Sequence, residues 1–134
     1  MAGGSDQLTI RSSLRRVIGL DADFTLDSEH MHIVRLTGNV TLRNGAIPAT
    51  AVDISDGGVG VLTTTFVPKR SLGTLRILNP RDNTLSLFSS RVRVARSQMV
   101  DRRPGYMLGL LFEDDSEGFE ERLMEFLAMV DEVM

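Results

Sequence analysis

A six-residue stretch near the middle of the chain carries residue types suited to binding a polar ligand. It reads Asp53-Ile54-Ser55-Asp56-Gly57-Gly58 and lies between two apolar runs that are typical of strands. Because side chains alternate along an extended chain, the carboxylate of Asp53 and the hydroxyl of Ser55 are predicted to project from one face. Gly57 and Gly58 lack a Cβ and would let a ligand approach the backbone. The stretch predicts a polar binding site, and a plain hairpin turn built from the same residue types is the alternative.

A second segment, close to the N-terminus, has the chemistry of an anion-binding site. Arg11-Ser12-Ser13-Leu14-Arg15-Arg16 holds three arginines, and Lys69 is the only lysine among the 15 basic residues of the chain. A guanidinium donates forked N–H groups to phosphates or base edges and stacks on aromatic rings, which lysine does poorly. A basic tail that contacts only solvent is the alternative, and so is a general bias of the composition toward arginine.

Composition and charge exclude several classes of protein. With 134 residues, 42% of them hydrophobic, the chain has the size and composition of a single globular domain. A net charge of −3 argues against general binding of DNA or RNA. No apolar run approaches the roughly 20 residues that span a bilayer, and the first residues lack the features of a signal peptide. We therefore expect a cytoplasmic protein without membrane insertion.

Neither catalysis nor metal binding is expected from the residue types present. The chain has no cysteine, and its only two histidines, in His30-Met31-His32, have no nearby third metal ligand. No phosphate-binding loop of the Gly-x-x-x-x-Gly-Lys type occurs, and no base is evident that would activate the hydroxyl of Ser55. A binding protein without a bound metal or cofactor is the expectation.

Hydrophobic patterning predicts a chain of short strands followed by one helix. The predicted strands cover residues 17–26, 33–43, 46–54, 59–66, 72–78, 84–97 and 106–112. Asn44-Gly45 predicts a type I′ hairpin turn, which needs positive φ at both positions. In the last segment, 113–134, Ser116 is the expected N-cap of an amphipathic helix. Its apolar stripe consists of Phe119, Leu123, Phe126, Leu127 and Val130.

This order of elements predicts a mainly β protein: a small antiparallel barrel of six to seven strands with a C-terminal α-helix against one opening. Residues 1–32 are predicted to be an N-terminal arm carrying the arginines, and residues 33–134 the barrel and helix. Methionines at 124, 129 and 134 make a self-association surface on the helix, and hence a homodimer, an option.

A strand that leads into Asp-x-Ser-x-x-Gly, a small barrel and a C-terminal helix together resemble a PilZ domain. The matching motif residues are Asp53, Ser55 and Gly58, with Gly57 a frequent choice in the family. Tyr106-Met107-Leu108-Gly109-Leu110-Leu111-Phe112, followed by acidic residues and a helix, resembles the last strand of that family. The resemblance covers roughly residues 33–134.

The resemblance implies a receptor for the bacterial second messenger cyclic di-GMP. The family also uses Arg-x-x-x-Arg just before its first barrel strand, which Arg11 and Arg15 match, with Arg16 adjoining. These arginines would bind a phosphate or a guanine edge, and Asp53 would accept hydrogen bonds from guanine. Ser55 would pair with a base edge, and Gly57 and Gly58 would admit the ligand.

The spacing between the two motifs leaves two possibilities open. Arg15 lies 38 residues before Asp53, more than one strand and a turn require. If 33–43 is the first barrel strand, the second arginine of the motif falls near Arg35, and Met31 stands where the first should be. Either residues 17–32 are an insertion that lets Arg11 and Arg15 fold back to the site, or the chain keeps half the motif.

Two functions follow from these possibilities. The first is a cyclic di-GMP receptor or adaptor that changes conformation on binding and signals to a regulatory, motility or envelope protein. The second is a degenerate PilZ-like module that binds proteins and no nucleotide.

Overall fold

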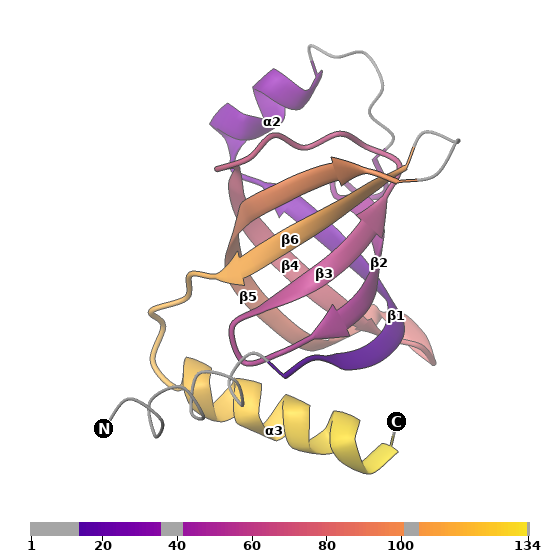
Figure 1. Cartoon of the computed structure of the whole chain (residues 1–134), viewed down its shortest axis with the longest axis vertical. Coiled ribbons are helices and arrows are strands. Elements are labelled where there is room, and N and C mark those ends of the chain that lie inside the picture. Colours follow the sequence, from indigo (N-terminus) through magenta and orange to yellow (C-terminus); the bar gives the residue numbers. More distant parts are fainter. Residues whose placement is uncertain (1–13, 36–41, 101–104, 134) are drawn as a thin grey trace.

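The chain forms a closed six-stranded antiparallel barrel with a helix at each end (Figure 1). The computed structural model describes residues 14–35, 42–100 and 105–133. Its strands and helices are β1 (Arg16–Leu26), α2 (Ser28–Arg35), β2 (Ile47–Ile54), β3 (Gly58–Thr63), β4 (Leu72–Asn79), β5 (Asp82–Met99), β6 (Tyr106–Phe112) and α3 (Phe119–Val133). Around the barrel the strands follow the order β1-β2-β3-β6-β5-β4, and β4 pairs with β1 to close it. The predicted fold class is confirmed.

The N-terminal part of the chain differs from the prediction. Residues 16–26, assigned to the arm, form the first barrel strand, as the predicted extended segment 17–26 allowed. The predicted strand 33–43 is wrong at its start, because α2 extends to Arg35; residues 36–41 lie outside the described residues. Met31 and Val34 are the buried positions of α2, three residues apart as on one face of a helix.

The turn that follows α2 was predicted correctly. Asn44 has φ of 54° and Gly45 of 80°, and Arg43 and Ala46 exchange backbone hydrogen bonds of 2.8 and 3.1 Å. Positive φ at both central residues defines the type I′ geometry. This turn leads the chain from the α2 segment into β2.

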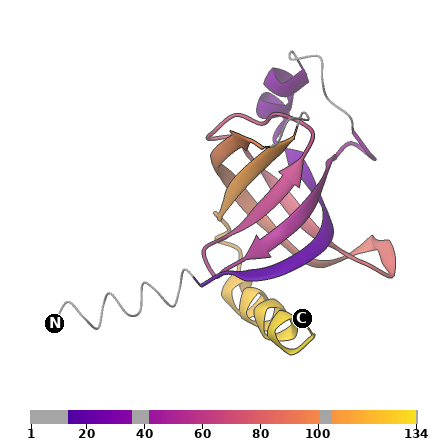
Figure 2. The ribbon, with the colours of Figure 1, turned by 45° about the vertical axis from the view of Figure 1, so that its right-hand side comes forward.

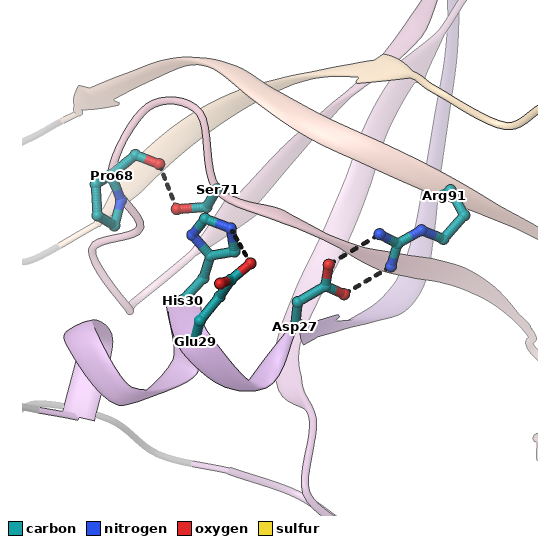
Figure 3. A network of polar contacts seen from close by, with 6 residues as sticks. All are labelled: Asp27, Glu29, His30, Pro68, Ser71 and Arg91. Carbon is teal, nitrogen blue, oxygen red and sulfur yellow. Dashed lines mark hydrogen bonds and ion pairs between the residues drawn. The ribbon is translucent and has the colours of Figure 1, made fainter.

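An ion pair fixes the start of α2 against the barrel (Figure 3). Asp27, between β1 and α2, accepts from both terminal nitrogens of Arg91 on β5, at 2.7 and 2.9 Å. Nearby, Nε2 of His30 lies 3.6 Å from Oε1 of Glu29, and the hydroxyl of Ser71 donates to the carbonyl of Pro68. The hydrogen bonds from Arg91 lower the pKa of Asp27, so its carboxylate stays charged well into the acid range.

Helix α3 closes the opposite end of the barrel from α2 (Figures 1 and 2). Its buried residues are the five of the predicted stripe: Phe119, Leu123, Phe126, Leu127 and Val130. Phe88 of β5 stacks on Phe126 with ring centroids 5.2 Å apart, and Phe112 of β6 packs edge-on against Phe119 at 5.6 Å. The loop before α3 and the β2–β3 hairpin therefore share one end of the molecule.

We expect the Asp27–Arg91 pair to make stability depend on acid pH. The pKa of Asp27 is lower in the folded chain than the roughly 3.9 of an unfolded aspartate. The pair therefore stabilises the fold above that value, and this contribution is lost as pH falls through the lower folded-state pKa. Asp27→Asn should reduce the free energy of unfolding at pH 7 by on the order of 1 kcal/mol and flatten its fall below pH 4.

Urea unfolding between pH 2 and pH 7 measures both effects. Asp21→Asn is the control, since Asp21 is exposed and has no ion pair among the described residues. An acid profile of Asp27→Asn that parallels the wild-type profile would refute the assignment.

Candidate functional site

The predicted motif, residues 53–58, forms the turn of the β2–β3 hairpin and the strand ends beside it. Ser55 N–H donates to the carbonyl of Gly58 at 2.9 Å, and Gly57 N–H donates to the Ser55 hydroxyl at 3.2 Å. Ser55 is buried, with 3% of its surface exposed. The turn-forming role of this serine, raised as the alternative, is therefore what the geometry displays, and its contact with a ligand stays a prediction.

Asp53 is the junction between the hairpin and the arginine segment. Its Oδ1 accepts from the guanidinium of Arg15 at 2.9 Å and from the backbone N–H of Gly60 at 3.1 Å. The side chains of Arg15 and Asp53 are 44% and 30% exposed, so solvent and ligands can reach the pair. Arg15 thus lies at the motif despite the 38 residues between them.

Strand pairing explains how that gap is bridged. Because β1 pairs antiparallel with β2, Val17 lies opposite Asp53 and the residues just before β1 lie beside the hairpin. Helix α2 and the turn at Asn44 occupy the intervening chain at the other end of the barrel. The intervening segment therefore leaves Arg15 in contact with Asp53. Residues 17–26, considered above as part of an insertion, are instead the barrel strand β1, and Arg11 lies outside the described residues.

The neighbouring arginine contacts a different element. Arg16 donates from Nε to Asp131 of α3 at 2.5 Å. Consecutive residues thus tie the start of β1 to the hairpin, through Arg15, and to the C-terminal helix, through Arg16. No feature of the sequence signalled Asp131, because its partner lies 115 residues away along the chain.

The other two arginines named from the sequence lie elsewhere. Arg35 is the last residue of α2, at the end of the barrel opposite the hairpin, so it does not share a site with Asp53 (Figure 1). Arg11 lies outside the described residues. Of these arginines, Arg15 is therefore the one whose side chain bonds the motif within the described residues.

Gly57 and Gly58 have different structural roles. A Cβ on Gly58 would lie 2.0 Å from the carbonyl oxygen of Leu110 on β6, whereas one on Gly57 would have the Ser55 hydroxyl, at 3.9 Å, as its only close neighbour. Gly58 is buried and Gly57 exposed. Packing of β3 on β6 explains Gly58, and open surface at Gly57 suits the approach of a ligand.

The surface beyond the hairpin, toward the start of α3, is acidic. A depression of about 420 Å³ there is lined by Asp56, Asp114, Glu120 and Glu121 together with Gly57, Phe112, Ser116, Gly118 and Phe119. Burial raises the pKa of Asp114, but hydrogen bonds from Ser116 and the Arg91 backbone outweigh it, and the net pKa lies below the usual value. The negative charge of this surface disfavours an anionic ligand in the depression itself.

One groove of the described structure lies away from the motif. It measures about 650 Å³ and lies between β5 and α3. Its two arginines are already engaged: Arg91 with Asp27, and Arg122 with the Ser116 hydroxyl at 3.1 Å. We therefore place the candidate site at Arg15, Asp53 and Gly57 rather than in this groove.

Metal binding and membrane insertion were the two other questions raised by the sequence. Among the residues described, no three His, Asp or Glu side chains lie together as metal ligands would. Neither α2 nor α3 is long and apolar enough to cross a membrane.

The chain belongs to the PilZ domain family, whose sequence pattern it matches over residues 11–129. The match begins at Arg11 and includes β1, in agreement with β1 as the first barrel strand. No curated protein compared with the chain matches it.

Solved structures share the fold at low sequence identity. A tetrameric PilZ domain protein from Xanthomonas campestris is 15% identical with a TM-score of 0.62, over 98% of this chain and 95% of that one. The PilZ domain of YcgR from Escherichia coli, solved with cyclic di-GMP, is 14% identical with a TM-score of 0.55, over 89% of each chain. The inhibitor of motility MotI from Bacillus subtilis is 15% identical, with a TM-score of 0.57 over 88% of this chain. The chain spans about half of MotI, 49% of its length.

The two glycines of the turn provide a matched test of their roles. Gly58→Ala should destabilise the fold by about 3 kcal/mol or more, because its Cβ meets backbone that cannot move aside. Gly57→Ala should change the free energy of unfolding by less than about 1 kcal/mol. Thermal and urea unfolding of both variants measure this, and equal stabilities would contradict the assignment.

Proposed function

We propose that this chain is a cyclic di-GMP receptor that acts as a small adaptor. The observation that carries the proposal is the contact of Arg15 with Asp53, which unites the two ligand-binding motifs expected of the family on one exposed surface. A chain with half the motif would lack this contact. The degenerate interaction module is therefore the less favoured function.

Each residue of the site has a chemical role in this proposal. Arg15 would donate forked N–H groups to a phosphate or to guanine O6 and N7, and Arg11 would act beside it. The carboxylate of Asp53 would accept from guanine N1–H and its amino group. Since Arg15 bonds Asp53, binding would exchange an internal ion pair for contacts with the dinucleotide.

That exchange offers a route from the ligand to the rest of the molecule. Arg15 and Arg16 are adjacent, and Arg16 bonds Asp131 of α3. Movement of Arg15 toward a ligand would shift the backbone of Arg16. The hydrogen bond from Arg16 to Asp131 of α3 would then change. The exposed face of α3, which includes Met124 and Val133, would then change for a partner protein.

The partner is proposed to be a regulatory, motility or envelope protein, in a cytoplasmic setting. Self-association through α3 also stays a prediction. Closure of the segment before β1 over the ligand completes the proposed mechanism, and that segment lies outside the described residues.

Calorimetry tests the binding step. Arg15→Ala and Asp53→Ala should each weaken binding of cyclic di-GMP by about tenfold to a hundredfold, since a hydrogen bond to a charged group contributes about 1.5–3 kcal/mol. Arg81→Ala, at an exposed arginine of the β4–β5 turn, is the control and should bind as wild type does. A folded wild-type protein that gives no heat at high micromolar ligand would leave only the interaction module.

Hydrogen exchange tests the coupling step. Ligand should alter amide exchange in the β2–β3 hairpin and in α3 of the wild-type protein, because Arg16 joins the two. In Asp131→Asn the hairpin should still respond and the helix should not. Glu132→Gln, an exposed neighbour with no ion pair in the described chain, should behave as wild type. An unchanged α3 response in Asp131→Asn would exclude this route.

A further inference from the structure

One row of residues crosses four neighbouring strands on the outer wall of the barrel. Asp53 of β2 pairs with Gly60 of β3, Gly60 with Gly109 of β6, and Gly109 with Arg96 of β5. Figure 1 shows β2, β3, β6 and β5 following one another around the barrel. At about 4.8 Å per strand spacing, the row runs roughly 14 Å from Asp53 to Arg96.

The two middle positions of this row, Gly60 and Gly109, have no side chains. The side chains of Asp53 and Arg96, at the two ends of the row, lie over them. A Cβ on Gly60 would lie 2.5 Å from Oδ1 of Asp53, so the carboxylate lies over that glycine. A Cβ on Gly109 would lie 3.4 Å from the Arg96 Cβ and 3.7 and 3.9 Å from its Nε and one terminal nitrogen. The guanidinium of Arg96 therefore extends over Gly109, toward the carboxylate side of the row.

Arg96 differs from the other arginines of its strand. Arg91 donates to the carboxylate of Asp27, and a terminal nitrogen of Arg93 lies 2.7 Å from a carboxylate oxygen of Glu113. Arg96 is exposed and has neither an ion pair nor a side-chain hydrogen bond within the described part of the chain. Its cation thus lies over the backbone of Gly109, in the same row as Asp53, with no acidic partner among residues 14–35, 42–100 and 105–133.

We propose that Arg96 is a third arginine of the ligand site, besides Arg11 and Arg15, and that it binds the dinucleotide from the side opposite Arg15. This inference rests on the proposed function and adds a residue that neither sequence motif contains. Asp53 would then lie between two cations, Arg15 from the β1 side and Arg96 from the β5 side. Arg96 donates two N–H groups to one acceptor edge of the ligand, either a phosphate or guanine O6 with N7.

The bare row gives this arrangement its physical basis. If the exposed Arg96 side chain moves aside from Gly109, a flat base over that glycine would meet the Asp53 carboxylate at one edge and the Arg96 guanidinium at another. A larger residue at either glycine would occupy that space. The acidic surface on the other side of the hairpin, around Asp56 and Asp114, disfavours an anion there.

Calorimetric titration with cyclic di-GMP, carried out on three variants of the full chain, tests the inference. Arg96→Ala should weaken binding by about tenfold to a hundredfold, and Arg96→Lys should recover only part of the loss because lysine lacks the forked donor. Arg93→Ala, an outward-facing arginine on the same strand, is the matched control and should bind as wild type does. Melting temperatures should show Arg96→Ala to be as stable as wild type, since the side chain has no partner in the described structure.

The outcomes separate this inference from the proposed function. Wild-type affinity in Arg96→Ala, with a loss in Arg15→Ala, would overturn the role of Arg96 and leave the receptor intact. Full affinity in Arg96→Lys would overturn the forked contact. A wild-type protein that binds no cyclic di-GMP would overturn the receptor and this inference together.

Discussion

The arrangement of the site depends on the two hydrogen bonds that one oxygen of Asp53 accepts. Arg15 donates one from the residue before β1, and the Gly60 backbone donates the other from β3. A carboxylate in this position joins three consecutive barrel strands at their outer surface. It also neutralises Arg15, which would otherwise face solvent without an anion. A ligand that competes for Asp53 therefore acts on both the N-terminal segment and the hairpin.

The inserted helix shows why the strand order was harder to predict than the strands. The hairpin, the turn at Asn44 and the C-terminal helix follow from local sequence, since turn residues and periodicity are local signals. The segment 28–35 is short, and the alternation of Val34 with later apolar residues outweighed the helical spacing of Met31 and Val34. As a result, the sequence pattern assigns β1 to the arm, and the separation of Arg15 from Asp53 exceeds what one strand and a turn require.

Residue type alone also gives an incomplete account of the hairpin. Gly58 belongs to a motif expected to admit ligand, yet the carbonyl of Leu110 leaves it no room for a side chain. The sequence motif pointed to Asp53 and Ser55 but not to Gly60, Gly109 or Arg96. Those three become neighbours only through strand register, because β6 inserts between β3 and β5 in the barrel. A single sequence carries no signal for that order.

The central claim is that ligand replaces Arg15 as the partner of the Asp53 carboxylate and binds Arg96 further along the outer wall of the barrel. Titration of ¹⁵N-labelled protein with cyclic di-GMP, followed by NMR, tests it most directly. The amide of Gly60 bonds Asp53 and is the natural reporter. The account predicts saturable shifts at Gly57, Gly60 and Gly109, with the amides of α2 unchanged. Shifts confined to the groove between β5 and α3, or none at all, would contradict it.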